Sequence, residues 1–132
     1  MFKIKSLDHV VIRVKDLPAV NAFYVNVLGC SEDKRRDDLG LVHLRVGQSL
    51  IDLISVDGPL GRAGGPPPGA GGRNMDHLRL QIEPFDLNEL RAHFQDAGLD
   101  TGNVQMNYGA GGDGPSIYVS DPEGNTIELK GG

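Results

Sequence analysis

The sequence predicts an α+β fold in which one unit, a strand followed by a helix and then two or three strands, is used twice. The first observation is an internal repeat, because residues 7–14 (LDHVVIRV) resemble residues 75–82 (MDHLRLQI). The second is that a helix-like apolar stretch ending in glycine follows each copy, and the third is that each half then returns to strand-like sequence. The 132 residues suffice for two such small units.

The helices and strands expected in each half follow from local signals. In the first half, Asp16 and Pro18 mark a helix start and Gly29 its end. In the second half, Asp86 and Glu89 have the spacing of a capping box, and Gly98 ends the helix. Strands are expected over residues 41–46, 50–56, 116–120 and 126–130.

The chain contains two glycine-rich segments. Residues 58–72 contain seven Gly and four Pro, which is typical of a linker. The second segment, residues 108–116 (YGAGGDGPS), is followed by a strand, whereas a phosphate-binding loop precedes a helix, so we expect a mobile loop at the mouth of a site. The predicted organisation is a single domain with a first module over about residues 5–57, a linker over 58–74 and a second module over about 75–132.

Composition excludes several classes of partner. The net charge is −5, only 5% of residues are aromatic and there is no Trp, which disfavours binding to nucleic acid. The single cysteine, Cys30, cannot form an internal disulfide, and the N-terminus lacks the features of a signal peptide. No apolar run approaches the length of a membrane span, so we expect a cytoplasmic protein without membrane contact.

Alternation along the expected strands separates an aliphatic face from a face with ionisable groups. Because successive strand residues point to opposite faces, the second face carries His9, Asp52, His77 and Glu128. Any one of them alone is more often an ordinary strand residue. Together, as two imidazoles and two carboxylates at equivalent positions of a repeat, they suit one divalent metal ion, Zn, Ni, Mn, Co or Fe(II).

Two further side chains share this face. His43 alternates with Val42 and Leu44, and Tyr118 lies between Ile117 and Val119. Both are candidate substrate contacts, and a structural hydrogen bond is the alternative role for each.

These motifs together resemble the vicinal oxygen chelate superfamily, which contains glyoxalase I, fosfomycin resistance proteins, extradiol dioxygenases and bleomycin resistance proteins. The resemblance covers nearly the whole chain. It rests on four segments in this order: LDHVVIRVKDL with His9, FYVNVLG, MDHLRLQI with His77, and YVSDPEGNTIELKG with Glu128.

The resemblance implies two βαβββ modules whose curved mixed sheets enclose a metal cleft, commonly completed in a homodimer. The ligand pattern of glyoxalase I-like members maps onto His9, Asp52, His77 and Glu128, with Asp52 one methylene shorter than the usual Glu. Arg13 matches an arginine that binds the glutathione carboxylate in glyoxalase I and its relatives. Glu128 is then the expected proton acceptor, with Asp52 as its partner.

Three functions follow as hypotheses. The first is a metal-dependent lyase or isomerase of the glyoxalase type, which acts on a small carbonyl compound or its thiol adduct through chelation of two vicinal oxygens. The second is a fosfomycin-type thiol or water transferase or a ring-cleaving dioxygenase, in which three ligands suffice and Asp52 is not one of them. The third is a metal-free drug-sequestering protein of the bleomycin resistance kind, against which the retained ligand set argues.

Overall fold

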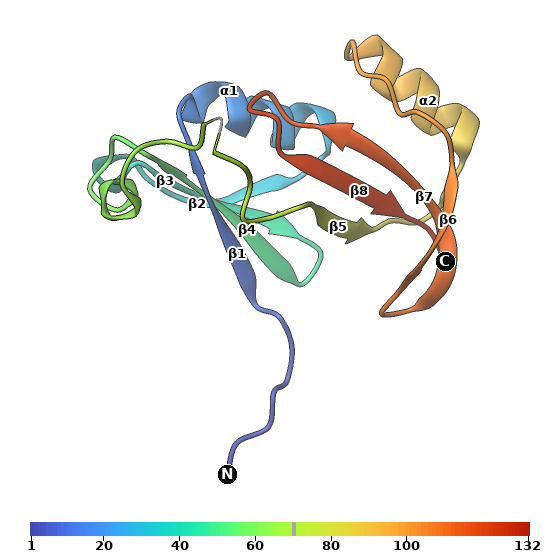
Figure 1. Ribbon diagram of the computed structural model, residues 1–132, viewed down its shortest axis with the longest axis horizontal. Helices are drawn as coiled ribbons and strands as arrows, with labels where there is room; N and C mark the ends of the chain where they lie inside the picture. Colours follow the sequence, from blue (N-terminus) through green and yellow to red (C-terminus); the bar gives the residue numbers. More distant parts are fainter. Residues whose placement is uncertain (70) are drawn as a thin grey trace. The chain divides into compact units, whose positions relative to one another are not determined.

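The computed structural model describes residues 1–69 and 71–132 and divides the chain into two compact units, Met1–Gly71 and Gly72–Gly132 (Figure 1). The division falls inside the predicted Gly/Pro linker. The prediction that both modules form one domain stays a prediction.

The first unit contains one four-stranded mixed sheet and a short helical segment. In the sheet order β1-β4-β3-β2, β1 and β4 are parallel, whereas the other neighbours are antiparallel. Helix α1 continues directly into a π-helical turn and packs against β4. The elements are β1 (His9–Val14), α1 (Leu17–Ala22), the π-helical turn (Phe23–Val27), β2 (Ser31–Arg36), β3 (Leu41–Val46) and β4 (Ser49–Ser55), with 3₁₀ turns at Asp37–Leu39 and Gly61–Gly64.

The second unit repeats this arrangement. Its sheet has the order β5-β8-β7-β6, again with one parallel pair, β5 with β8, and two antiparallel pairs. The elements are β5 (Leu78–Gln81), α2 (Leu87–Asp96), β6 (Gln105–Gly109), β7 (Gly112–Ser120) and β8 (Thr126–Lys130). The predicted α+β class with two modules of one topology is confirmed.

Both helices begin at the predicted residues. The side chain of Asp16 accepts a hydrogen bond from the amide of Ala19, and the side chain of Asp86 accepts one from the amide of Glu89. Gly29, which follows the π-helical turn, has a φ of 80°, a conformation that favours glycine at the end of a helical segment. Local signals therefore place these boundaries without help from tertiary contacts.

The cores are formed by the aliphatic faces that alternation predicted. In the first unit the buried apolar set is Ile12, Val14, Val20, Phe23, Tyr24, Cys30, Val42, Leu44, Ile51, Leu53 and Val56; in the second it is Phe94, Ile117, Val119, Ile127 and Leu129. One face of each sheet is thus occupied by packing, which leaves the other face to polar side chains.

The expected loop at residues 108–116 is wrong. These residues belong to a hairpin in which β6 pairs with β7 from Gln105 opposite Ser116 to Gly109 opposite Gly112. A Cβ atom at Gly109 would meet the side chains of Arg79 and Lys130, and one at Gly114 would collide with the carbonyl of Gly131. The glycines therefore make room for neighbouring groups inside a sheet.

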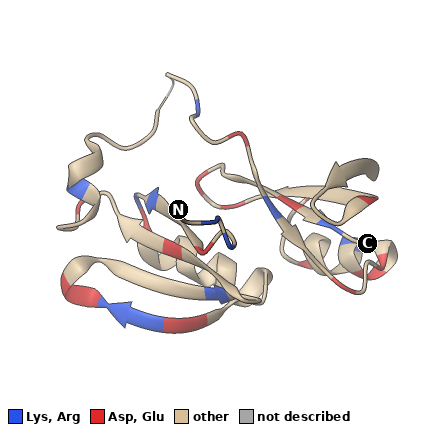
Figure 2. Cartoon of the chain, turned by 90° about the horizontal axis from the view of Figure 1, so that it is seen from below, with Lys and Arg blue, Asp and Glu red and all other residues tan. Residues whose placement is uncertain are grey.

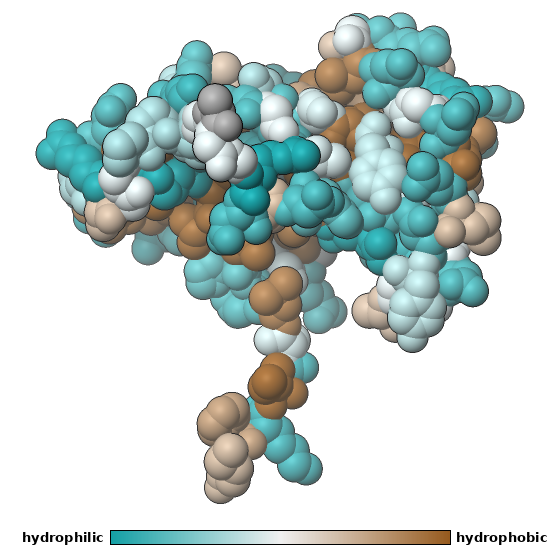
Figure 3. Space-filling model, in the orientation of Figure 1, coloured by the Kyte–Doolittle hydropathy of each residue, from teal (hydrophilic) through white to brown (hydrophobic). Residues whose placement is uncertain are grey.

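Strand β2 and the N-terminal segment expose charged and apolar side chains, respectively, in the first unit. Strand β2 (SEDKRR) is exposed along its length and carries ion pairs, among them Arg35 with Glu32 at 2.5 Å (Figure 2). Apolar side chains of the N-terminal segment are exposed, including Phe2 and Ile4 (Figure 3). No helix among the described residues is long and apolar enough to cross a membrane.

Candidate functional site

Glu128 of the second unit is fully buried, with none of its surface exposed, and Lys130 in the same strand is buried to the same extent. It lies in β8 between Ile127 and Leu129, which point into the core, so alternation turns Glu128 to the opposite face. The sheet register then places Arg79 of β5 and Tyr118 of β7 directly beside it. Three strands therefore enclose one carboxylate.

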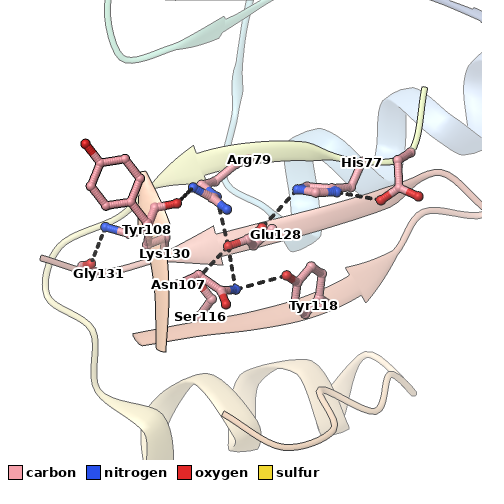
Figure 4. Close-up of polar contacts among 10 residues, drawn as sticks. His77, Arg79, Asn107, Tyr108, Ser116, Tyr118, Glu128, Lys130 and Gly131 are labelled. Atoms are coloured by element: carbon pink, nitrogen blue, oxygen red, sulfur yellow. Dashed lines mark hydrogen bonds and ion pairs between the residues drawn. The ribbon is translucent and has the colours of Figure 1, made fainter. Parts of the chain in front are cut away.

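One oxygen of this carboxylate is fully occupied by donors. Glu128 Oε2 accepts hydrogen bonds from Ser116 Oγ at 2.7 Å and from Asn107 Nδ2 at 3.1 Å, and it lies 2.8 Å from Arg79 Nε (Figure 4). Arg79 is itself held, because its Nη1 donates to the carbonyl of Tyr108 at 2.6 Å. The donors fix the direction in which the other oxygen points.

These donors also control the charge of Glu128. Burial raises the pKa of the carboxyl group, but the hydrogen bonds to the charged form outweigh that effect and lower the pKa from 4.5 to about 2. Glu128 is therefore an anion at every physiological pH. Burial and the neighbouring Glu128 raise the pKa of Tyr118, which stays a neutral phenol.

The second oxygen of Glu128 faces a histidine. Glu128 Oε1 lies 3.0 Å from His77 Nε2, and among residues 1–69 and 71–132 it accepts no hydrogen bond. The other ring nitrogen, His77 Nδ1, lies 2.8 Å from Asp76 Oδ2. A buried oxygen without a donor, opposite an imidazole nitrogen, is an arrangement that a bound cation satisfies.

The first unit contains a related pair. Asp52 of β4 has a side chain only 7% exposed, and its Oδ2 lies 3.7 Å from His9 Nε2. Its Oδ1 is 2.8 Å from His43 Nδ1, and His9 Nδ1 is 2.7 Å from Asp8 Oδ2. The hydrogen bond to Asp8 is the main cause that raises the pKa of His9. In both units, one carboxylate oxygen is held by neighbours and the other faces the repeated histidine.

The donor atoms fit a divalent metal ion. Two ligands at about 2.1 Å from a metal, at angles between 90° and 109°, lie roughly 3.0 to 3.4 Å apart. The separation in the second unit, 3.0 Å, falls in this interval, whereas 3.7 Å in the first unit is slightly wider. Each unit supplies a pair, and within the described part of the chain no cluster of three His, Cys, Asp or Glu side chains forms a metal site by itself.

The three predicted substrate contacts have different surroundings. His43 is bonded to Asp52, and the Tyr118 hydroxyl accepts from Asn107 Nδ2 at 3.0 Å while its ring packs edge-on against His77. The guanidinium of Arg13 is engaged with linker backbone, since its Nε donates to the carbonyl of Gly61 at 3.0 Å and its other nitrogens to those of Gly65 and Pro66. Their roles toward a substrate stay predictions.

Sequence reasoning missed three partners of Glu128. The register of β5 against β8 reveals Arg79, which alternation already placed on the face of His77. Ser116 shares the face of Tyr118 by the same alternation and could have been found. Asn107 lies in β6, which was not predicted as a strand.

Two mixed sheets of identical strand order, each with a histidine facing a buried carboxylate, define a protein of paired βαβββ modules. Residues 6–129 match the family model described as the Glyoxalase/Bleomycin resistance protein/Dioxygenase superfamily. The chain belongs to this superfamily, and the resemblance noted in the sequence is confirmed.

Similar proteins and solved structures include a virulence protein, a lactoylglutathione lyase and a fosfomycin resistance protein. Virulence protein STM3117 of Salmonella typhimurium is 28% identical, over 96% of this chain and 83% of that protein. A lactoylglutathione lyase from Agrobacterium tumefaciens is 22% identical, with a TM-score of 0.72 and coverage of 98% of this chain and 96% of its own. A variant of the fosfomycin resistance protein FosX from Listeria monocytogenes, complexed with Mn(II) and 1S,2S-dihydroxypropylphosphonic acid, is 20% identical, with a TM-score of 0.70 and coverage of 97% and 90%. The latter two show the fold alone.

Proposed function

We propose that the protein is a metal-dependent lyase or isomerase of the glyoxalase type, acting on a small carbonyl compound or its thiol adduct. His9, Asp52, His77 and Glu128 would hold one divalent ion, Zn, Ni, Mn, Co or Fe(II). The observation that carries the proposal is the recurrence, in both units, of an imidazole Nε2 facing a buried carboxylate oxygen whose partner oxygen is held by neighbours. When bound, such an ion supplies a Lewis acid that polarises two vicinal oxygens of a substrate.

The two carboxylates suit different tasks. With a pKa of about 2 and one oxygen already surrounded by donors, Glu128 is a weak base at neutral pH and a permanent anionic ligand. Of its two predicted roles, the ligand role is therefore better supported. Asp52 has fewer partners, and it is the better candidate to take a proton next to the substrate carbonyl and return it.

The remaining polar side chains would bind and orient the substrate. The Tyr118 hydroxyl and the ring of His43 lie on the sheet faces that carry Glu128 and Asp52, respectively. Arg13 would require release from the linker carbonyls before it could bind a carboxylate of the substrate. A small-molecule substrate, a homodimer and a cytoplasmic location belong to the same proposal.

A second candidate is a fosfomycin-type thiol or water transferase, or a ring-cleaving dioxygenase, with a three-ligand site. The observation that favours it is the bond between His43 and Asp52, which occupies one oxygen while the other stands 3.7 Å from His9 Nε2. The Mn(II) in the similar FosX variant is consistent with metal chemistry on this fold. A metal-free drug-sequestering protein is the third alternative.

The test is elemental analysis of the purified protein, followed by assays with 2-oxoaldehyde–thiol adducts, epoxides with thiols, and catechols. We expect about one divalent ion per site in the wild type and its loss in His77→Ala. Turnover of the adducts that disappears with chelation supports the lyase. Undiminished metal in His77→Ala, or drug binding that is unaffected by chelation, would overturn the proposal.

A further inference from the structure

Residues 1–7 (MFKIKSL), which we call the N-terminal arm, precede β1 and extend beyond the sheet of the first unit without forming a helix or strand (Figure 1). Phe2 and Ile4 are 76% and 89% exposed, respectively. They alternate with Lys3 and Lys5, so apolar and cationic side chains point to opposite faces when this segment is extended. Such alternation is typical of a strand with one apolar face.

Strand β4, which pairs with β1, begins too late in the chain to accompany the arm. The pairing starts at His9 opposite Leu50, and the Leu50 amide also donates to the carbonyl of Asp8 at 3.2 Å. Strand β4 itself begins at Ser49, where the chain turns from β3. An extended segment of seven residues spans roughly 23 Å. The arm is therefore long enough to pair with a strand outside its own sheet.

The edge strand β6 of the second unit also exposes apolar side chains. It pairs with β7 on one side and forms an edge of its sheet. Met106 and Tyr108 are 70% and 78% exposed and share one face of the strand, because they are two residues apart. Edge strands commonly carry charged residues or proline, which prevent pairing with another chain. The sequence of β6, QMNYG, contains neither, so this edge is open to a further strand.

The register of β6 indicates which of its backbone groups are free to pair. A two-residue turn joins Gly109 to Gly112, which lie opposite each other in the hairpin. Because hydrogen-bonded and non-hydrogen-bonded pairs alternate from there, the backbone groups of Met106 and Tyr108 point away from β7. Arg79 already donates to the carbonyl of Tyr108 at 2.6 Å. The amide and carbonyl of Met106 are therefore the centre of the edge that a further strand can use.

The arm and β6 complement each other in polarity and charge. Among the described residues, the exposed large apolar side chains other than Val11 and Leu60 all belong to one of these two segments. Paired strands gain stability from apolar side chains that lie opposite each other. The arm contains two lysines and no acidic residue, whereas the whole chain has a net charge of −5, and Asp113, opposite Tyr108, is exposed. A second copy therefore attracts the arm and presents an open edge for it.

We propose that the N-terminal arm adds as a strand to the β6 edge of a second copy of this chain, with Phe2 and Ile4 packed against Met106 and Tyr108. Under twofold symmetry the two arms of a dimer make the same contact twice. The inference rests on the homodimer of the proposed function and identifies a surface that forms it. It does not depend on the metal site.

The first measurement is the dimerisation constant of the full chain, treated with chelator, by sedimentation equilibrium. One double variant carries Phe2→Ser and Ile4→Ser, and the other carries Met106→Ser and Tyr108→Ser. All four side chains are mostly exposed, so both variants should remain folded, which circular dichroism checks. We expect each double variant to weaken dimerisation roughly 10- to 100-fold. The quadruple variant should dimerise no more weakly than the weaker of the two, because both remove the same contact. The matched control Leu60→Ser removes an exposed apolar side chain outside both segments and should change nothing.

A mixture of the two double variants tests whether the contact joins different chains. A mixed dimer contains one intact arm opposite one intact β6 edge, so the mixture should associate more strongly than either variant alone. Hydrogen exchange should show the amide of Met106 protected in the wild-type dimer and unprotected in both double variants. If the arm instead pairs with β6 of its own chain, mixing restores nothing and the protection of Met106 persists on dilution, which would overturn the inference.

Two further results would also overturn it: an unchanged dimerisation constant in either double variant, or effects of the two variants that simply add in the quadruple variant. In both cases the homodimer of the proposed function still stands, because the wild type associates. A monomeric wild type would overturn the homodimer together with this inference. Zinc uptake by the same wild-type protein then decides the metal part of the proposed function separately.

Discussion

The two oxygens of the Glu128 carboxylate have different surroundings. Its Oε2 accepts hydrogen bonds from Ser116 and Asn107 and forms an ion pair with Arg79, whereas within residues 1–69 and 71–132 its Oε1 accepts none and faces His77. Leaving a buried oxygen unsatisfied costs free energy in a protein that only has to fold. The arrangement is therefore better explained by a ligand that binds there than by stability.

The low pKa of Glu128 predicts how stability depends on pH. Because the pKa falls from 4.5 to about 2 on folding, the group stabilises the folded state above pH 4.5, and this contribution is lost as pH falls toward 2. The shift corresponds to about 3 kcal/mol at neutral pH. Urea unfolding of metal-free wild type and Glu128→Gln should show a difference at pH 7 that shrinks by pH 3. An equal difference at both pH values would contradict the prediction.

A comparison of Asp52→Asn with Glu128→Gln separates four-ligand from three-ligand sites. We expect both variants to lose zinc affinity, with the larger loss in Glu128→Gln because its oxygen lies nearer the histidine nitrogen, 3.0 Å against 3.7 Å. The loss in Glu128→Gln should exceed the roughly 10- to 100-fold cost of removing an outer partner. Chelator competition measures both. Wild-type affinity in Asp52→Asn beside metal release in Glu128→Gln would refute four ligands and favour the transferase alternative.

At the residue scale, the sequence predicted the site only in part. Period-two alternation and the repeat were enough to place His9 and Glu128 on the polar sheet faces, because the face to which a strand residue points depends only on local backbone geometry. The contact of Arg79 with Glu128 could not be predicted from the local pattern, because only the pairing of β5 with β8 brings the guanidinium group to this carboxylate. The contact of Arg13 with the linker is a tertiary feature without any local signal.

At the scale of elements, strands with ordinary apolar alternation were predicted and two others were missed. Strand β2 is charged and exposed along its length, so it lacks an apolar face. Strand β6 enters a hairpin whose glycines suggested a loop. Both strands lie at sheet edges, where one neighbour and few buried side chains leave a weak sequence pattern.

The glycine-rich hairpin yields a prediction about packing. A Cβ atom at Gly114 would collide with the carbonyl of Gly131 and lie 3.0 Å from Lys130 Nζ, so Gly114→Ala should destabilise the protein by about 1–3 kcal/mol. Gly111→Ala is the matched control in the same hairpin, because its nearest neighbour would be the Gly132 carbonyl at 3.6 Å. Thermal unfolding of the two variants checks this. Equal melting temperatures would show that the hairpin tolerates a side chain at position 114.

At the scale of the whole molecule, the open sheet edges predict self-association. Within their own units, β1, β5 and β6 each have one unpaired edge among the described residues, and β2 alone is protected by charge along its length. Pairing with a second copy covers such edges under twofold symmetry. We expect a homodimer by light scattering at micromolar concentration. A monomeric mass with metal bound would contradict this prediction.

The two pairs of the repeat make it possible to test whether one chain or two chains supply the metal site. Each unit holds one histidine–carboxylate pair, and the family resemblance implies that sites are commonly completed across a dimer. Co-expression of His9→Ala with His77→Ala tests this, because a mixed dimer then contains one site with both pairs intact. Random pairing should restore zinc to about one quarter of all sites, although each variant alone binds none. If both pairs of a site come from the same chain, every site carries one defect and co-expression restores no zinc. Uptake by elemental analysis therefore distinguishes exchange between chains from assembly within one chain.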